Sequence, residues 1–80
     1  MELYRINCSF CHGWQPGEPG PVGKHLQPPP PSLEKTVLQP LQDVDIYRFI
    51  AFGLGRMPPF QNRLNNDERW LLVRYLRTLP

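Results

Sequence analysis

Apolar side chains recur at helical spacing near the beginning of this 80-residue chain. Leu3, Ile6 and Phe10 are three and four residues apart, which places side chains on one face of a helix. We predict a first helix from about Glu2 to Cys11. Gly13 follows it and is expected to end it, because glycine readily adopts the conformations found after a helix C-terminus.

A second helix is predicted to begin at Asp43. Aspartate is a favourable N-cap residue, since its side chain accepts a hydrogen bond from the first helical turn. The apolar positions that follow are again three and four residues apart, and the pattern stops where two glycines appear. The side chains that we expect to face the interior are Ile46, Phe49 and Ile50, and the glycines are Gly53 and Gly55.

The last predicted helix has the clearest boundaries. Asn65 is its expected N-cap, and Glu68 stands three residues later in a capping-box arrangement. Acidic residues come early and arginines late, which suits the helix dipole. One apolar stripe consists of Leu72, Tyr75, Leu76 and Leu79, with Leu71 at its edge, Trp70 off its centre, and Pro80 after it. We interpret the aromatic residues here as core.

The segment from Trp14 to Gln42 is rich in proline, glycine and glutamine, with four consecutive prolines from Pro28 to Pro31. Such a run favours polyproline II, a stiff conformation without internal hydrogen bonds. We interpret it as a structural spacer, with a P-x-x-P docking ligand as the alternative. A short helix is expected over Ser32 to Leu38, capped by Ser32. The chain therefore reads as an all-α domain of three to four short helices joined by long Pro- and Gly-rich loops.

Charge and length exclude several classes of protein. Nine Lys and Arg against seven Asp and Glu give a net charge of +2, and no basic block is present, so nucleic acid is not an expected partner. No stretch approaches the ~20 apolar residues of a transmembrane segment, and no signal peptide is visible. A single domain of 80 residues has a marginal core unless a cofactor, a metal or disulfides add to it.

The strongest chemical signal is Cys8-Ser9-Phe10-Cys11-His12, a C-x-x-C-H motif inside the first predicted helix. This motif is the attachment signature of a covalently bound c-type haem. At this spacing both thiols and the imidazole lie on one helix face. The two sulfurs can then bond the vinyl groups of one porphyrin while His12 approaches the iron. We predict one haem c, bound through two thioethers, with His12 as the first axial ligand.

Two other interpretations of the cysteine pair are weaker. A thioredoxin-like redox motif needs a βαβ pattern around it, and a zinc site needs more ligands. The chain has only two cysteines, and His25 is the only histidine besides His12. Because bacteria attach haem c outside the cytoplasm, we expect a periplasmic or otherwise extracytoplasmic location. A targeting segment has then been removed, or the chain is a piece of a longer protein.

Met57 is the candidate for the second axial ligand. Pro58 disfavours the α conformation at Met57, so we expect this residue in an extended loop, whereas a core methionine more often lies on a periodic apolar stripe. Apart from the cysteines and the terminal Met1, its thioether is the only soft donor. Met57 lies 45 residues after His12, which lets the chain pass round the ring to its opposite face.

With these motifs in place, the sequence resembles class I cytochrome c, the small all-helical monohaem family. The resemblance covers essentially the whole chain and implies a fold wrapped around one haem, in which the first and last helices cross and Tyr4 packs against Leu72 and Tyr75. Four features carry it in order: Tyr4-x-x-x-Cys8-x-x-Cys11-His12-Gly13, Gly20-Pro21 followed by the proline-rich stretch, Met57-Pro58-x-Phe60, and the helix from Trp70 to Leu79.

The resemblance also implies a role for individual residues. Cys8 and Cys11 match the thioether positions, His12 the proximal ligand and Met57 the distal ligand. Pro21 resembles the residue whose backbone carbonyl accepts a hydrogen bond from the proximal imidazole. The apolar residues expected to bury the ring are Leu26, Ile46, Phe49, Ile50, Phe60 and Leu72.

One departure from the family concerns the beginning of the chain. The family usually has a small residue four positions before the one that Tyr4 occupies, and this chain begins at Met1. We therefore expect residues 1–80 to be a single cytochrome domain that is truncated at its N-terminus or excised from a longer protein.

An iron with His and Met ligands changes oxidation state with little ligand movement and does no bond-making chemistry. We therefore predict a one-electron carrier or relay domain and not an enzyme. Its expected partners are redox proteins that dock transiently onto a monomer, with a membrane tether in the parent protein as an option. Arg5 and Arg56 could steer acidic partners, or they could be solvated charges. The alternative function is a haem-based gas sensor or peroxidase-like domain in which Met57 is absent from the iron or is displaced.

Overall fold

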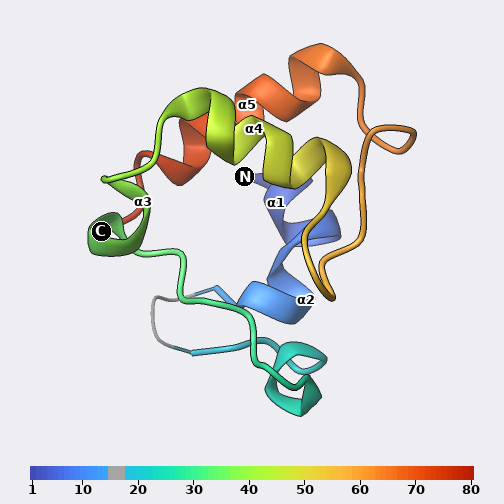
Figure 1. The fold of residues 1–80 in the computed structure, drawn as a ribbon, viewed down its shortest axis with the longest axis vertical. Coiled ribbons are helices and arrows are strands. Elements are labelled where there is room, and N and C mark those ends of the chain that lie inside the picture. The colour runs from blue at the N-terminus through green and yellow to red at the C-terminus, as the bar shows by residue number, and fades with distance from the viewer. Residues whose placement is uncertain (15–17) are drawn as a thin grey trace.

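The computed structural model describes residues 1–14 and 18–80. Within these residues the chain is helical and has no β-strand; its elements are α1 (Glu2–Asn7), α2 (Ser9–His12), η1 (Gly23–His25), α3 (Lys35–Leu38), α4 (Asp43–Phe52) and α5 (Asn66–Leu76) (Figure 1). The predicted all-α fold is confirmed, with more helical segments than the three to four expected. No helix among the described residues is long and apolar enough to cross a bilayer.

The first predicted helix is interrupted at Cys8. The φ of this residue is −124°, outside the helical range, so α1 ends before it and α2 begins after it. The side chains of Asn7 and Ser9 each donate to the main-chain carbonyl four residues earlier, at 3.0 and 2.7 Å. Such bonds compete with the main-chain pattern and bend helices. The prediction of one continuous helix was wrong here, whereas Gly13 ends α2 with a φ of +80°.

Local hydrogen bonds determine where the two longest helices begin. α4 is capped by Gln42, one residue before the predicted cap Asp43, and the Gln42 N–H donates to the Asp45 carboxylate at 3.0 Å. α5 has the predicted capping box. The Asn65 side chain accepts from the Glu68 N–H, and the Glu68 carboxylate accepts from the Asn65 N–H, both at 2.8 Å.

α3 begins later than predicted. Its N-cap is Glu34, an extended residue, and not Ser32. The N–H of Lys35 in the first turn has no acceptor within the helix, and it donates instead to the carbonyl of Pro80 at 3.1 Å. This hydrogen bond therefore ties the start of α3 to the C-terminal residue of the described chain.

α5 ends at Leu76 and not at Leu79, because Thr78 closes a turn. The N–H and the hydroxyl of Thr78 both donate to the carbonyl three residues earlier, at 2.9 and 2.6 Å. Arg77 then reaches the connection between α3 and α4, where its guanidinium pairs with the Asp43 carboxylate at 2.8 Å and donates to two main-chain carbonyls. Leu79 still packs against the core.

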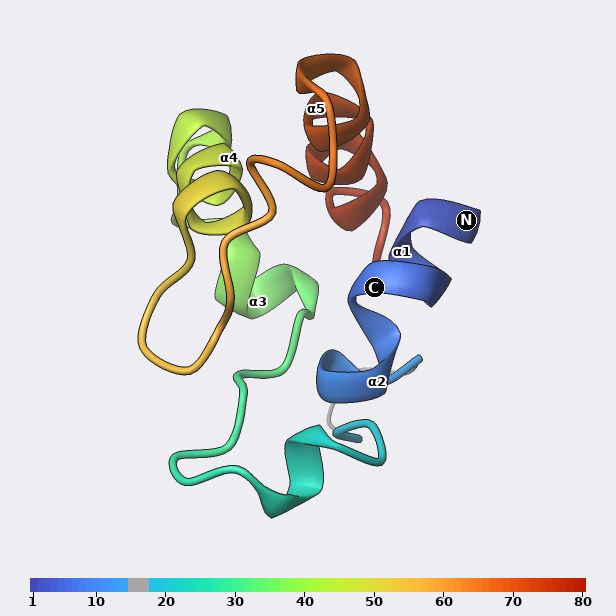
Figure 2. The same cartoon turned by 90° about the vertical axis from the view of Figure 1, so that its right-hand side faces the viewer.

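A cluster of buried apolar side chains joins α1, α3, α4 and α5. α1 lies against the C-terminal half of α5 (Figure 2). The Tyr4 ring is 5.3 Å from that of Tyr75 and belongs to the same cluster as Leu72, as the resemblance implied. The Tyr4 hydroxyl is buried and donates to the Gly13 carbonyl at 2.5 Å. The other buried members are Leu38, Ile46, Ile50, Phe60, Leu64, Val73 and Leu76.

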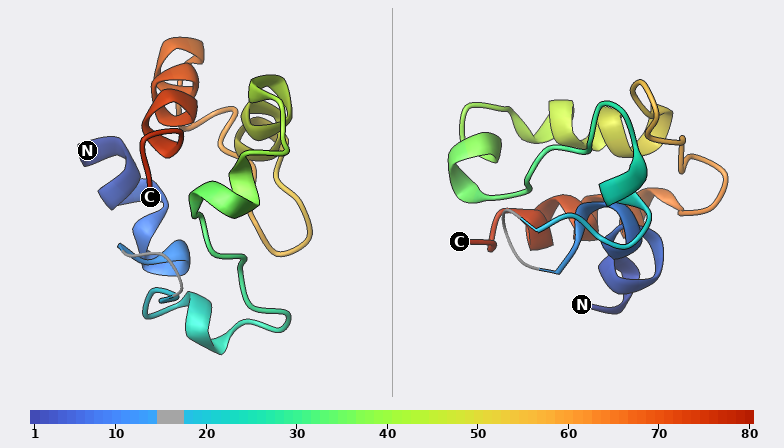
Figure 3. Two further views of the ribbon diagram at one scale, coloured as in Figure 1. Left: turned by 90° about the vertical axis from the view of Figure 1, so that its left-hand side faces the viewer. Right: turned by 90° about the horizontal axis from the view of Figure 1, so that it is seen from below.

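α4 and α5 run side by side (Figure 3). Tyr47 stacks on Trp70 with ring centroids 4.4 Å apart, and its hydroxyl donates to the Asn66 side chain at 2.7 Å. Arg69 donates to the Tyr47 hydroxyl at 3.0 Å and to the Gln61 carbonyl at 2.9 Å. Trp70 therefore packs at the edge of the helix pair, 36% exposed, and not in the core.

Replacing Tyr4 with Phe tests the hydrogen bond that joins α1 to the residue after α2. We expect the free energy of unfolding of the haem-containing protein to fall by about 1 kcal/mol at pH 8, because a buried carbonyl loses its donor. Burial raises the pKa of Tyr4 to about 12, so its contribution is complete below pH 10 and is lost as the pH rises through 12.

Denaturant titrations between pH 8 and 12 measure both effects. Tyr4→Phe should flatten the alkaline loss of stability. Tyr75→Phe is the matched control, since the structure gives no hydrogen bond for that hydroxyl among the described residues. A wild-type alkaline profile unchanged by Tyr4→Phe would contradict the assignment.

Candidate haem site

The helices and loops surround an apolar cavity of about 440 Å³. Its wall comes from the end of α1, from α2, α3, α4 and α5, and from the loops before α3 and after α4. The proline tract, which we interpreted as a spacer, forms part of this wall. All the apolar side chains predicted to bury a ring line the cavity: Leu26, Ile46, Phe49, Ile50, Phe60 and Leu72.

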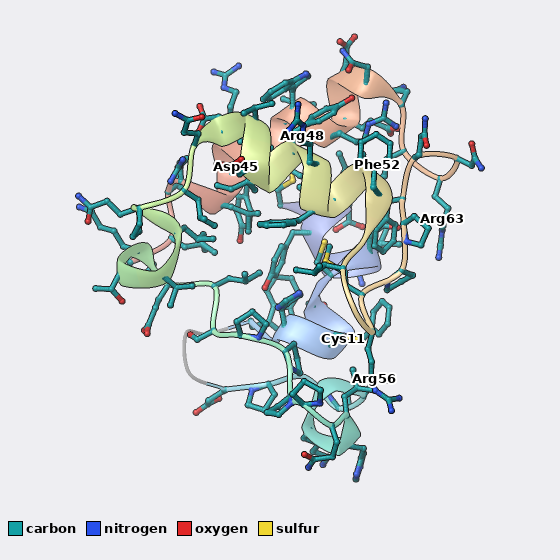
Figure 4. The ribbon with its side chains drawn as sticks, viewed as in Figure 1. Cys11, Asp45, Arg48, Phe52, Arg56 and Arg63 are labelled. Atoms are coloured by element: carbon teal, nitrogen blue, oxygen red, sulfur yellow. The ribbon has the colours of Figure 1, made fainter. Side chains whose placement is uncertain are left out.

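Cys8 and Cys11 line the cavity as free thiols (Cys11 is labelled in Figure 4). Burial, with a smaller effect of the neighbouring Cys11, raises the pKa of Cys8 to about 11. Burial also raises the pKa of Cys11. A redox-active C-x-x-C pair requires a lowered thiol pKa, so the environment of these cysteines disfavours the thioredoxin-like interpretation.

His12 is the last residue of α2, and its imidazole lines the same cavity. Its Nδ1 lies 3.2 Å from the Pro31 carbonyl oxygen. With the hydrogen on Nδ1 the ring donates to this carbonyl, and Nε2 keeps a lone pair for a metal. Burial lowers the pKa of His12, and the hydrogen bond with Pro31 opposes that shift. The neutral imidazole that binds metals is therefore favoured.

The main-chain carbonyl that faces the His12 imidazole is that of Pro31, and not that of Pro21 as expected. Pro21 is exposed, does not line the cavity, and lies in the turn that precedes η1. The later part of the chain brings a carbonyl next to the His12 imidazole at the proline tract. A run of prolines has no N–H groups to occupy its own carbonyls, so those carbonyls are available as acceptors. That property of the tract was the sequence signal for Pro31.

Two glycines let the next loop pack against α2. The Val22 N–H donates to the Phe10 carbonyl at 2.8 Å, and the Gly20 N–H donates to the Cys11 carbonyl at 3.0 Å. A Cβ atom on Gly23 would lie 1.9 Å from the Cys11 carbonyl oxygen, and one on Gly20 would lie 2.4 Å from that of Phe10. The loop that contains Gly20 and Gly23 therefore packs directly against the backbone that carries the two thiols. Neither glycine has a side chain that would prevent this contact.

Met57 lies in the loop after α4, half-buried and on the cavity wall, as expected from Pro58. Its main chain pairs with Leu54 through two hydrogen bonds, at 2.9 and 3.2 Å, which close the loop. The Phe60 N–H donates to the Ile50 carbonyl at 3.0 Å and anchors the end of this loop segment on α4. In Figure 2 the loop after α4 lies to the left of α2, and Met57 from the loop and His12 from α2 both line the cavity.

Comparison with known proteins gives the family. Residues 1–76 match the family described as cytochrome C oxidase, cbb3-type, subunit III. The chain belongs to this family. It is therefore a monohaem c-type cytochrome domain, and it transfers electrons through haem and is not itself an enzyme.

Two relatives of the cytochrome are named cytochrome bc1 complex cytochrome c subunit. The protein from Corynebacterium diphtheriae is 30% identical over 78 residues, which are 96% of this chain and 25% of that protein. The one from Corynebacterium efficiens is 28% identical over 78 residues, which are 96% of this chain and 24% of that protein. The cytochrome spans about a quarter of the length of these relatives.

The residues of the cytochrome fit a c-type haem. The donors on the cavity wall are two thiols, a neutral imidazole and a thioether, and these N and S groups are the ones that attach haem c and bind its iron. The rest of the wall is mainly apolar, with Asn7 and Arg56 as its other polar side chains, and such a wall suits a flat apolar ring. Besides Pro31, sequence reasoning missed Leu33, Leu38 and Leu41, which line the cavity from a segment whose helical pattern was too short to assign a face.

Substitution of Gly23 by Ala tests the packing behind the C-x-x-C-H motif. We expect a loss of about 2 to 3 kcal/mol in the free energy of unfolding of the haem-containing protein, because the loop must move off α2. Gly55→Ala is the control: its φ of +59° favours glycine, but a Cβ there meets open space, so the loss should be about 1 kcal/mol. Equal losses in denaturant titrations would contradict the packing argument.

Proposed function

We propose that this cytochrome domain is a one-electron relay in which Cys8 and Cys11 hold haem c covalently and His12 and Met57 are the axial ligands. The observation that supports it is the presence of all four side chains on the wall of one apolar cavity. Haem supplies, when bound, an iron that gains or loses one electron. With both axial positions taken, the site is suited to electron transfer and not to chemistry on a substrate.

The chain's own groups keep the site rigid and dry. Pro31 orients the His12 imidazole and makes it a stronger donor, and the paired backbone of Leu54 and Met57 holds the thioether in place. The apolar wall keeps water away and disfavours the extra positive charge of the oxidised state, which raises the reduction potential. Little protein movement is then needed when the charge changes.

The relatives suggest where such a relay works. They are named as subunits of a bc1 complex and are about four times longer than this chain. We propose that residues 1–80 act as one cytochrome domain within a larger electron-transfer protein, outside the cytoplasmic membrane, and exchange electrons with respiratory redox proteins.

Covalent attachment is tested by replacing the cysteines with serine. Wild type purified after export should have the mass of the polypeptide plus one haem and should keep its colour after extraction with acidified acetone. Cys8→Ser and Cys11→Ser should each retain at most one thioether, and the double variant should lose all haem on extraction. Mass spectrometry of extracted protein measures this, and a coloured, haem-weighted double variant would refute the attachment.

The Met57 ligand is tested by Met57→Ala, with Met1→Ala as the matched control. We expect the weak near-red iron–sulfur absorption band of the oxidised protein to vanish in Met57→Ala and to persist in Met1→Ala. The reduction potential should fall in Met57→Ala alone, since methionine ligation raises it.

Carbon monoxide distinguishes the relay from a gas sensor. The reduced wild type should bind it poorly, and reduced Met57→Ala should bind it readily, because only the variant has an open axial position. Rapid and complete binding by the wild type would overturn the relay and favour the sensor.

A further inference from the structure

Asn7 is the one amide side chain that lines the cavity among the described residues. It is the last residue of α1 and immediately precedes Cys8, and its side chain is buried, with Asn7 only 8% exposed. A polar atom in apolar surroundings costs free energy when it has no hydrogen-bond partner, so buried polar groups are normally paired. Both polar atoms of this amide therefore affect the energy of the site.

The two polar atoms of the Asn7 amide have different surroundings. The nitrogen, Nδ2, donates to the Leu3 carbonyl at 3.0 Å. Because a carbonyl only accepts hydrogen bonds, the amide atom that faces Leu3 is the nitrogen, and the oxygen points away from Leu3. The structure gives this oxygen no hydrogen-bond partner among residues 1–14 and 18–80. The side chain is thus held at its nitrogen and unpaired at its oxygen.

The unpaired oxygen opens onto the cavity. Within the described part of the chain, every buried side-chain nitrogen or oxygen that protein atoms enclose completely has a partner. The Asn7 oxygen has none, so protein atoms do not enclose it, and the free space that Asn7 lines is the cavity. Arg56 and His12 also line the cavity, but each has a nitrogen beside a main-chain carbonyl. Among the described residues, Asn7 contributes the only side-chain oxygen on this wall.

We propose that the Asn7 side-chain carbonyl stabilises the oxidised state of the site and lowers the reduction potential of the domain. This inference rests on the proposed function, because it needs a haem iron in the cavity. The oxidised state carries one more positive charge than the reduced state, and the negative end of a carbonyl dipole favours that charge. Apolar surroundings screen the interaction only weakly. Asn7 therefore opposes the apolar wall, which raises the potential.

The hydrogen bond with Leu3 keeps this dipole fixed. The carbonyl of Leu3 belongs to the same helix, and the Cys8 N–H that follows Asn7 donates to the Tyr4 carbonyl at 2.9 Å. The oxygen consequently keeps its direction when the charge of the site changes. A dipole that is already oriented needs no rearrangement during electron transfer, which suits a relay.

Asn7→Leu tests the proposal, because leucine has a similar branched shape and no polar atom. We expect the reduction potential of the haem-containing protein to rise. At the potential at which wild type is half reduced, the ratio of reduced to oxidised protein should increase about three- to tenfold in the variant. Spectroelectrochemical titration measures this ratio. An unchanged near-red iron–sulfur band of the oxidised variant shows that the axial ligands are intact.

Two further variants separate the oxygen from the hydrogen bonds around Cys8. Asn7→Asp loses the amide nitrogen but keeps an oxygen on the wall in either protonation state, so its potential should equal that of wild type or be lower. Ser9→Ala is the matched control. Ser9 is also 8% exposed and donates to the carbonyl four residues earlier at 2.7 Å, but it does not line the cavity. Ser9→Ala should change the ratio by less than about twofold.

The outcomes separate this proposal from the proposed function. A raised potential in both Asn7→Leu and Asn7→Asp, or an equal rise in Ser9→Ala, assigns the effect to the helix break and contradicts the proposal. An unchanged potential in Asn7→Leu contradicts it too, and leaves the relay standing. If Asn7→Leu yields no haem-containing protein, Asn7→Val carries the same expectation. The relay itself fails on a different result, a near-red band that persists in Met57→Ala.

Discussion

The arrangement of this protein depends on one constraint: its helices surround a large apolar cavity instead of filling their own centre. At ~24 cal/mol per Å³, contacts missing across about 440 Å³ are worth on the order of 10 kcal/mol, which is comparable with the whole stability of a small domain. The fold therefore requires an apolar group in contact with these walls. Short helices and long loops suffice because that group supplies much of the core.

The longer helices and the candidate side chains of the site could be predicted from the sequence. The predictions were wrong where side chains form hydrogen bonds with the backbone. The period of apolar residues and the Asn65–Glu68 capping box fit α5 closely because both are local properties. The break at Cys8 depends on the competing bonds of Asn7 and Ser9, which periodicity does not report. Pro31 was missed because its partnership with His12 depends on the path of the whole loop between them.

Two arginines show how loops without regular structure are held. Arg69 and Arg77 donate to main-chain carbonyls of connecting segments, and each also bonds a side chain on α4. A guanidinium has five N–H donors in a rigid plane, so one residue can satisfy several carbonyls that lack helical partners. No local pattern in the sequence distinguishes such a structural arginine from a solvated one.

The bond between Arg56 and Gln27 has a consequence for biogenesis. It joins the loop that carries Met57 to the segment before the proline tract, and residues on both sides of it line the cavity. In the proposed haem protein, a rigid porphyrin would enter most easily while this bond is open. Attachment of the ring to Cys8 and Cys11 would then come before closure of the segment from Gly53 to Phe60.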